Sequence, residues 1–305
     1  MQMYYSYDGL EWFLSAKGMT KTSLAAELGI SSKTMAKMSR GEKIADHVLK
    51  RIADYFSCSV TELCAEKTNN LLLQTLRDEK DAKISGGLYH ELQVRMTYNS
   101  NHIEGSKLSE DQTRLIFETR TINATGGVPV DDIIETVNHF RAIDYVIDVA
   151  EDELTEEIIK ELHRILKQGT ADASLSWFAV GDYKKRANVV GGRETAKPKD
   201  VPARMKALLA AYDPKSVEDI IAFHHEFESI HPFQDGNGRI GRLILFKECL
   251  RNNIVPFIIE DDLKLYYYRG VKEWKTEHGY LRDTCLTAQD RFKTALDYFK
   301  IPYEE

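Results

Sequence analysis

The sequence predicts an all-α fold in two parts, a small N-terminal domain over residues 1–67 and a larger helical domain over residues 70–305. Apolar residues recur at three- and four-residue spacing in successive segments, which is the pattern of helices with one buried face. A single stretch, residues 181–192, predicts a short β-hairpin, because two valines there are bounded by glycines. The charged segment 69–87 ends in two glycines, and it places the boundary between the two parts near residues 67–70.

The composition is that of an ordinary globular protein. Of its 305 residues, 43% are hydrophobic and 29% are charged, which is enough for one large core or for a small domain joined to a larger one. The formal net charge of −7 argues against a protein that coats nucleic acid, but leaves room for one local basic face. No segment is apolar over the roughly 18 residues that span a bilayer, and the first residues form no leader, so we expect a cytoplasmic protein without a membrane partner. The cysteines lack the spacing of a zinc site and are expected to be reduced thiols; they are Cys58, Cys64, Cys249 and Cys285.

The first part of the chain is expected to fold as several short helices with tight turns between them. Apolar residues recur within residues 10–14 and again within residues 24–28. Gly29 is expected to end the second helix, and Ser31 or Ser32 to cap the third. This order of elements is a helix-turn-helix pattern. It resembles the lambda-repressor-like (XRE) DNA-binding domain, with residues 31–41 in the place of the recognition helix.

Basic side chains outnumber acidic ones between residues 17 and 51. The basic residues are Lys17, Lys21, Lys33, Lys37, Arg40, Lys43, Lys50 and Arg51, and the acidic ones are Glu27, Glu42 and Asp46. Such an excess suits interactions with nucleic-acid phosphates. The candidate DNA-binding residues are Ser32, Lys33, Lys37 and Arg40. The alternative that remains open is a helical interaction module without a DNA partner.

The segment with the clearest chemistry is HPFQDGNGRIGR, residues 231–242. A helix capped by Ser216 is predicted to run up to His231, and Pro232 marks its end. A second helix is predicted to begin at Arg239, after a loop rich in glycine and asparagine. The turn at residues 236–238 would therefore lie at a helix N-terminus, where unpaired N–H groups and the positive end of the helix dipole bind anions, phosphate above all.

Four side chains beside this turn complete a candidate nucleotide-phosphate site. Arg239 and Arg242 lie three residues apart, hence on one helix face, where both can bind phosphate oxygens. Two arginines at a helix N-terminus oppose the helix dipole, which indicates that a ligand supplies the missing negative charge. Asp235 can hold Mg²⁺ jointly with substrate oxygens. His231 can take a proton from an incoming hydroxyl.

Two other motifs overlap this region, and neither fits its context. GNGRIG satisfies G-x-G-x-x-G, but a dinucleotide fingerprint follows a buried strand, whereas residues 223–233 are polar and helical. His225 and Glu226 begin an H-E-x-x-H zinc motif whose fifth position is Ser229, so we expect no zinc site. The remaining histidines considered are expected to be packed or hydrogen-bonded; they are His139, His163, His224, His225 and His278.

Residues 231–242 resemble the Fic signature H-x-F-x-D/E-G-N-G-R-x-x-R at every defined position. The resemblance implies a helical bundle that transfers AMP from ATP to a Ser, Thr or Tyr hydroxyl of a protein and releases pyrophosphate. It implies that His231 is the general base, Phe233 a core anchor for the loop and Asp235 the Mg²⁺ ligand. The implied phosphate-binding residues are Gly236, Asn237 and Gly238 for the α- and β-phosphates, Arg239 for the β-phosphate and Arg242 for the γ-phosphate.

Two further segments are similar to parts of the same family. SNHIEG at residues 100–105 resembles the inhibitory motif S/T-x-x-x-E-G/N, with Ser100 and Glu104 at the defined positions of a helix near residues 95–105. Glu104 can pair with Arg242 and occupy the place that a γ-phosphate needs. The predicted hairpin corresponds to the family's flap, which pairs with an extended target segment. Its candidate docking residues are Tyr183, Val189, Val190 and Gly191.

The resemblance thus implies an autoinhibited protein adenylyltransferase with ATP as substrate and Mg²⁺ as cofactor, acting on a hydroxyl-bearing protein or on itself. Two alternatives stay open. One keeps the site but removes AMP or transfers another phosphate-containing group. The other is a DNA-binding regulator whose larger domain senses nucleotide. Helix-turn-helix domains of this kind usually act as dimers, so we expect a homodimer.

Overall fold

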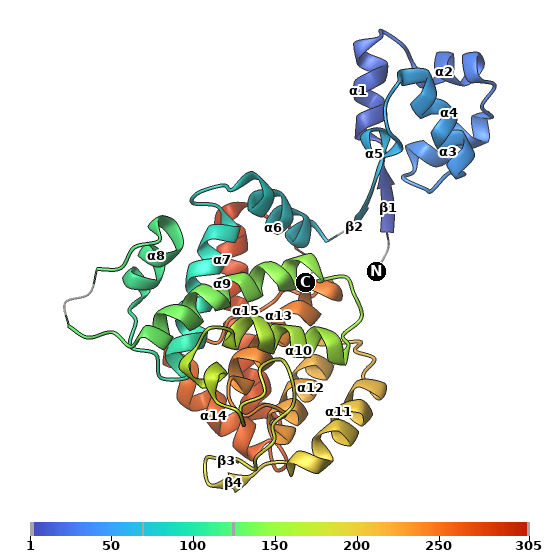
Figure 1. Cartoon of the computed structure of the whole chain (residues 1–305). Coiled ribbons are helices and arrows are strands. Elements are labelled where there is room, and N and C mark those ends of the chain that lie inside the picture. Colours follow the sequence, from blue (N-terminus) through green and yellow to red (C-terminus); the bar gives the residue numbers. More distant parts are fainter. Residues whose placement is uncertain (1–2, 69, 124–125, 304–305) are drawn as a thin grey trace. The chain divides into compact units, whose positions relative to one another are not determined.

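The structure is a computed structural model that describes residues 3–68, 70–123 and 126–303, and the chain divides into two compact units, residues 1–70 and 71–305 (Figure 1). Almost all of the regular structure is α-helical, which confirms the predicted fold class. Each unit has a hydrophobic core of its own.

The N-terminal unit is a bundle of short helices with one pair of strands. Its elements are β1 (Met3–Ser6), α1 (Asp8–Ala16), α2 (Lys21–Leu28), α3 (Ser32–Ser39), α4 (Asp46–Phe56), α5 (Val60–Leu63) and β2 (Ala65–Thr68). The helices α2 and α3 pack on each other and form the helix-turn-helix. Gly29, with φ of 60°, ends α2, and the hydroxyl of Ser31 caps α3 by accepting a hydrogen bond from the backbone N–H of Thr34.

The strand pair β1–β2 was not predicted, because the sequence indicates β-structure only at residues 181–192. The two strands are antiparallel, with Ser6 opposite Ala65, and they bring the two ends of the unit together. The N–H of Tyr5 also donates to the carbonyl of Gly41 at 2.7 Å, so β1 is held on its other edge as well. A strand of four residues is too short for alternation to be visible, although tyrosines favour strands.

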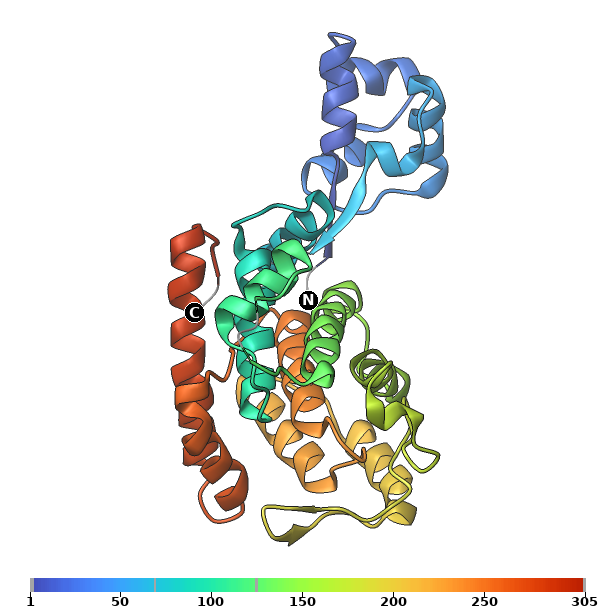
Figure 2. The same cartoon turned by 60° about the vertical axis from the view of Figure 1, so that its left-hand side comes forward.

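The larger unit is a helical bundle built around α13. Its elements are α6 (Leu71–Ala82), α7 (Leu88–Ile103), α8 (Glu110–Thr119), α9 (Val130–Asp148), α10 (Glu156–Lys167), η1 (Ala171–Ser174), β3 (Val189–Val190), β4 (Arg193–Glu194), η2 (Pro198–Asp200), α11 (Val201–Ala210), α12 (Val217–Ile230), α13 (Asn237–Arg251), η3 (Asp261–Leu263), α14 (Lys264–Glu273) and α15 (Gly279–Phe299). The helices α7, α9, α10 and α12 all pack against α13. The long helix α15, red in Figure 2, runs along one side of the unit and packs on α14.

Because α13 is surrounded, it is buried on nearly every face from Asn237 to Leu250. Such a helix is not amphipathic, and its polar residues must find partners inside the protein. The fully buried Lys247 does so by donating to the carboxylate of Glu248 at 2.9 Å and to the carbonyl of Asp152 at 2.6 Å. The motif at residues 231–242 therefore leads into a helix at the centre of the core.

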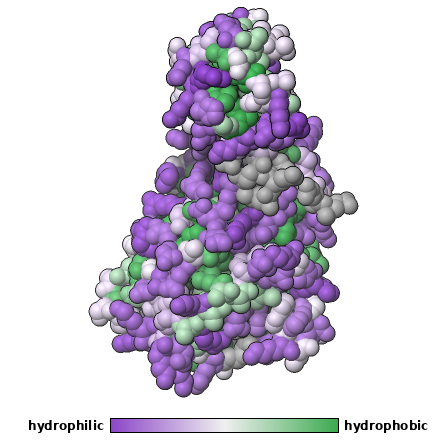
Figure 3. All heavy atoms as spheres, turned by 90° about the vertical axis from the view of Figure 1, so that its right-hand side faces the viewer, coloured by the Kyte–Doolittle hydropathy of each residue, from purple (hydrophilic) through white to green (hydrophobic). Residues whose placement is uncertain are grey.

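On the face shown in Figure 3, hydrophilic residues predominate. None of the helices in the described part of the chain has both the length and the apolar character that a bilayer-spanning segment requires.

Candidate active site

The turn before α13 has the geometry of an anion site. Gly236 adopts a left-handed conformation with φ of 81°, and a Cβ on it would lie 3.3 Å from Leu166. The first hydrogen bond of the helix runs from the N–H of Ile240 to the carbonyl of Gly236 at 3.0 Å. The N–H groups of residues 237–239 therefore lie at the open end of the helix, where the positive end of the dipole favours an anion.

The helix begins at Asn237, two residues before the predicted start at Arg239. The side chain of Asn237 accepts a hydrogen bond from the N–H of Phe233 at 2.8 Å and donates to the carbonyl of Phe233 at 2.9 Å. This pair of bonds closes the loop and engages the Asn237 side chain within it. The sequence pattern could not show this, because asparagine also favours loops.

Arg242 is held by the two residues of the predicted inhibitory motif. Its Nη2 donates to Glu104 Oε1 and to the carbonyl of Ser100, each at 2.8 Å, and its Nε donates to Ser100 Oγ at 3.1 Å. Burial disfavours the charged form of Arg242, but the Glu104 carboxylate keeps the pKa of Arg242 above its usual value. A Cβ built on Gly238 would lie 2.2 Å from Glu104 Oε1. The Glu104 carboxylate thus rests directly on the glycine turn, in the position of an anion.

Arg239 is also engaged by carboxylates. Both terminal nitrogens of Arg239 donate hydrogen bonds to the carboxylate of Glu135, on α9, and Asp235 Oδ2 lies 3.2 Å from Arg239 Nη2. The ammonium of Lys167, at the end of α10, contacts the same two carboxylates, at 2.5 Å from Glu135 and 2.8 Å from Asp235. Burial would raise the pKa of Asp235, but Arg239 and Lys167 lower it to about 2.

Glu135 and Lys167 could not be found from the sequence. They belong to amphipathic helices that carry no motif, and no local pattern shows that their side chains meet the loop at residues 235–239. Only the packing of α9 and α10 against α13 brings them there.

His231 is the C-terminal cap of α12, with φ of 54° and ψ of 63°. A left-handed conformation is uncommon for a residue with a side chain, and here it turns the chain sharply between α12 and the loop. His231 Nδ1 lies 3.7 Å from Glu228 Oε2, and both side chains are mostly buried. Burial would raise the pKa of Glu228, but His231 and His224 lower it, so Glu228 is a carboxylate.

Phe233 is fully buried, as expected of an anchor for the loop. Its ring stacks on His163 with a centroid distance of 4.1 Å and an interplanar angle of 3°. The ring of Tyr183 lies 5.8 Å from that of Phe233, and Tyr183 is 7% exposed. Tyr183 therefore belongs to the core and not to the hairpin, and its assignment as a docking residue is wrong.

The hairpin itself spans residues 189–194 rather than 181–192. Val189 pairs with Glu194 across a turn in which Gly191 and Gly192 both have positive φ. Val189 and Val190 are exposed. The prediction began too early because residues 181–188 return to the motif loop instead of forming a strand.

The hairpin is tied to the motif loop by a buried lysine that the sequence did not single out. Lys184 Nζ donates to Asn188 Oδ1 and to Thr195 Oγ1, each at 2.7 Å, and the Lys184 N–H donates to the carbonyl of Pro232 at 2.9 Å. Asn188 also donates to the carbonyl of Phe233 at 3.1 Å. Both ends of the hairpin are thereby fixed next to the loop that follows His231.

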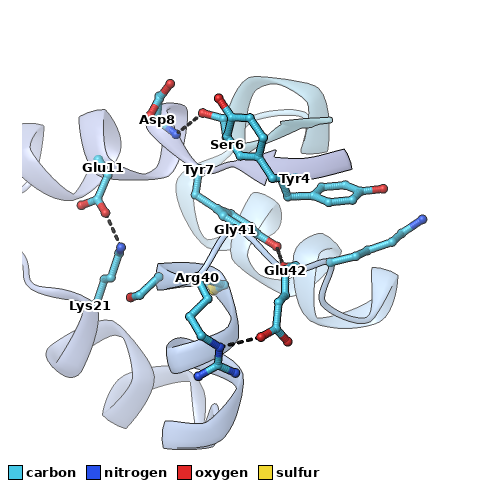
Figure 4. Close-up of a pocket in the computed structure, with 13 residues that line it drawn as sticks. Tyr4, Ser6, Tyr7, Asp8, Glu11, Lys21, Arg40, Gly41 and Glu42 are labelled. Atoms are coloured by element: carbon cyan, nitrogen blue, oxygen red, sulfur yellow. Dashed lines mark hydrogen bonds and ion pairs between the residues drawn. The ribbon is translucent and has the colours of Figure 1, made fainter. Parts of the chain in front are cut away.

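In the N-terminal unit, the four candidate DNA-binding residues differ in their surroundings. Ser32 and Lys33 are exposed at the start of α3. Arg40 pairs with Glu42 at 2.5 Å, and Lys37 lies 4.0 Å from the same carboxylate. Arg40 and Glu42 line a pocket of about 940 Å³ between β1, α1 and residues 38–43, where Glu11 and Lys21 also pair (Figure 4). Lys33 is therefore the basic residue of α3 best placed for a phosphate.

The structure also bears on metal ions and thiols. Within the described residues, no group of three or more His, Cys, Asp or Glu side chains is arranged to hold a metal ion. The four cysteines are free. A metal ion at Asp235 would thus depend on oxygens from a ligand, which is how Mg²⁺ commonly binds beside phosphates.

Comparison with known families separates the same two units. Residues 153–248 match the model of the Fic/DOC family, and residues 10–67 match that of the Cro/C1-type helix-turn-helix DNA-binding domain. The chain is 27% identical over 246 residues to the protein adenylyltransferase Fic of Aedes aegypti, an alignment that covers 78% of this chain and 46% of that protein. It is 31% identical over 183 residues to the protein of the same name from Drosophila willistoni, covering 57% of this chain and 35% of that protein.

Solved structures of the family share the fold. A Fic domain containing signaling protein from Bacteroides thetaiotaomicron superposes with a TM-score of 0.60 at 24% identity, covering 76% of this chain and 99% of that one. Fic-1 from C. elegans superposes with a TM-score of 0.59 at 21% identity, covering 75% and 72% of the two chains. The chain spans less than half the length of the two insect relatives. The larger unit thus contains a segment that matches the Fic/DOC family model, and a segment that matches the Cro/C1-type helix-turn-helix model precedes it.

Proposed function

We propose that the larger unit is an autoinhibited protein adenylyltransferase that transfers AMP from Mg-ATP to a hydroxyl of a protein target or of the chain itself. The observation that carries the proposal is the clustering of the glycine turn, Arg239, Arg242 and Asp235 at the N-terminus of α13, next to His231 at the end of α12. Relatives named protein adenylyltransferase support the choice of AMP as the transferred group.

The proposed reaction assigns one role to each group. His231 accepts the proton of the target hydroxyl while the hydroxyl oxygen forms a bond to the α-phosphorus of ATP. The bond between that phosphorus and the bridging oxygen breaks, and pyrophosphate leaves. The N–H groups at the start of α13, Arg239 and Arg242 stabilise the negative charge of the phosphates. A Mg²⁺ ion held by Asp235 and phosphate oxygens would neutralise further charge on the leaving group.

The proposal includes autoinhibition by Glu104. The carboxylate lies over Gly238 and neutralises Arg242. The γ-phosphate of ATP therefore lacks both the space beside the turn and the free guanidinium that would bind it. The hairpin at residues 189–194 is proposed to pair with an extended target segment, because it is anchored to the loop that follows His231. Removal of AMP from a modified target is the alternative chemistry at the same site.

The test is intact-mass analysis of the Glu104→Gly chain after incubation with ATP and Mg²⁺, with and without a cell lysate as target source. We expect a mass gain of one AMP on this chain or on a lysate protein, and no gain when His231→Ala is added. The matched control is Glu273→Gly, which removes another glutamate at a helix end that pairs with an arginine on the surface. Labelling that persists in the His231→Ala chain would contradict the role of His231.

A second function is favoured by the helix-turn-helix unit, which we propose binds DNA through α3. Ser32 and Lys33 lie exposed at the N-terminus of that helix, where recognition helices contact bases and phosphates. We expect salt-dependent binding to a palindromic site by a cytoplasmic homodimer, and binding that survives His231→Ala. A selection from a random duplex library that enriches no sequence would contradict it.

A further inference from the structure

Lys167 lies at the centre of three carboxylates. It is the last residue of α10, its side chain is 3% exposed, and its ammonium is 2.5 Å from Glu135, 2.8 Å from Asp235 and 3.4 Å from Asp172. Its ammonium also lies 5.4 Å from the centre of the Phe178 ring. A buried lysine is costly unless its charge is compensated, and here carboxylates from three different segments provide the compensation.

Lys167 and Arg239 share their partners. Both contact Glu135, and both approach the same oxygen of Asp235, Oδ2. Glu135, Asp235, Lys167 and Arg239 carry two negative and two positive charges, and the partly exposed Asp172, 3.4 Å from Lys167, adds one more negative charge at the edge of this group. Oδ2 of Asp235, the proposed metal ligand, is thereby bound by two cations of the protein itself.

This arrangement opposes the binding of a divalent cation on its own. A divalent ion that approached Asp235 would find a single carboxylate that already binds two cations. The Lys167 ammonium would also repel the ion at close range. Mg²⁺ loses its water molecules reluctantly and commonly needs phosphate oxygens as well as a carboxylate. A nucleotide brings both those oxygens and the negative charge that would balance the ion.

We propose that Lys167 is a positioning residue that serves as the resident cation of Asp235, so that a divalent ion enters this site with the nucleotide and not before it. The inference rests on the proposed function, because it takes Asp235 as the metal ligand. To the proposed function, this inference adds that the nucleotide and the divalent ion bind together, and that Lys167 prevents the ion from binding first.

The test measures Mn²⁺ binding to the full chain by electron paramagnetic resonance, without nucleotide and with ADP. For the wild type we expect binding at least about tenfold tighter with ADP than without it, which corresponds to about 1.4 kcal/mol. Lys167→Met removes the ammonium and leaves the three carboxylates. We expect this variant to bind Mn²⁺ without nucleotide at least about tenfold more tightly than the wild type.

Three variants control for charge and for location. Lys160→Met removes a lysine from the same helix that pairs with Glu156 and Asp182 outside this group, and it should leave Mn²⁺ binding unchanged. Lys167→Arg keeps the positive charge and should also leave Mn²⁺ binding unchanged. Asp235→Asn added to Lys167→Met should abolish the increase in affinity. An increase that survives Asp235→Asn would overturn the inference, because the ion would then bind elsewhere.

If Lys167→Met fails to fold, the Mn²⁺ affinities of the wild type with and without ADP still test the inference. Mn²⁺ binding to the nucleotide-free wild type within about threefold of that with ADP would overturn the inference. No increase in a folded Lys167→Met chain, as judged by circular dichroism, would overturn it too. Nucleotide binding is measured separately by calorimetry. If ADP does not bind to the wild type at all, the proposed function fails, whereas ADP binding without the predicted Mn²⁺ pattern contradicts only the role of Lys167.

Discussion

Glu104 Oε1 accepts a hydrogen bond from Arg242 Nη2 at 2.8 Å, across 138 positions of the sequence. Arg242 is 5% exposed, whereas the Glu104 side chain is 31% exposed, so the carboxylate can leave more easily than the guanidinium. The carboxylate lies against both a buried arginine and the glycine turn. It follows that a change at Glu104 should alter nucleotide binding without disturbing the core.

The first prediction concerns nucleotide selectivity. Glu104→Gly should raise the affinity for ATP by at least about tenfold, and the affinities for ADP and AMP less, because the carboxylate pairs with Arg242, the residue proposed to bind the γ-phosphate. Calorimetric titration with the three nucleotides checks this. Glu104→Gln, which keeps the shape and removes the charge, should lie between the wild type and Glu104→Gly. An equal increase for AMP would show that Glu104 blocks another part of the nucleotide.

The second prediction concerns Glu228, whose carboxylate faces His231 Nδ1 at 3.7 Å. A carboxylate there would orient the imidazole and stabilise the imidazolium that forms when His231 takes a proton. In the Glu104→Gly background, Glu228→Gln should lower kcat by at least about tenfold with little change in KM for ATP.

The control for Glu228 is Glu226→Gln, on the same helix. Glu226 is partly exposed and pairs with Arg204 on the surface, away from His231. Glu228 also faces His224 and Arg242, so urea unfolding of Glu228→Gln is measured in parallel to exclude a loss of stability. An unchanged kcat in the folded Glu228→Gln chain would contradict the proposed role.

The sequence predicts which residues of this site lie together better than it predicts the contacts that hold them. The signature from His231 to Arg242 is contiguous, so its residues must lie close together, and the structure places its glycine turn at the start of α13. Glu104 was found only because it belongs to a second motif. Glu135, Lys167 and Glu228 carry no pattern, since a charged residue on an amphipathic helix usually faces solvent. Their contacts depend on helix packing, which the sequence alone does not specify.

In the N-terminal unit too, the sequence predicts local features but not contacts between distant segments. Helix caps such as Ser31 and Gly29 are local, and the structure places them at the predicted helix ends. The pairing of β1 with β2 joins segments far apart in the sequence, with Ser6 opposite Ala65, and no local rule states that two such short segments meet.

The third prediction uses Lys184. Burial, with a smaller contribution from Arg204, lowers its pKa to about 8. Between that pH and the ordinary lysine value of about 10.4, the unfolded chain binds a proton that the folded chain has released. Stability of the wild type relative to Lys184→Met should therefore rise with pH in this interval, by roughly 1–3 kcal/mol.

Urea unfolding of the two chains at about pH 8 and about pH 10, near the folded and unfolded pKa values, measures this difference. Lys185→Met, at the exposed neighbouring position, provides the control and should show no such trend. If the difference between wild type and Lys184→Met is the same at both pH values, Lys184 titrates normally in the folded chain.

The fourth prediction separates two basic residues, Lys33 at the start of α3 and Arg40 directly after its end. Lys33→Ala should weaken DNA binding and lower the slope of affinity against salt by about one counterion, because the variant neutralises one phosphate fewer. Arg40→Ala should have a smaller effect, because Arg40 already pairs with Glu42. Fluorescence anisotropy at several salt concentrations distinguishes the two. A larger effect of Arg40→Ala would show that its ion pair breaks on binding.

The last prediction tests whether Phe233 anchors the loop or only fills the core. Phe233→Ala removes a fully buried ring that stacks on His163, and it should cost about 3–5 kcal/mol of unfolding free energy. Phe246→Ala removes an equally buried ring from α13, on the side that faces Phe292, and should cost a similar amount. Only Phe233→Ala should also weaken ADP binding, because Asn237 closes the loop onto the backbone of Phe233. Urea unfolding and calorimetry measure both quantities, and an equal decrease of ADP affinity in the two variants would mean that the loop is held by the core as a whole.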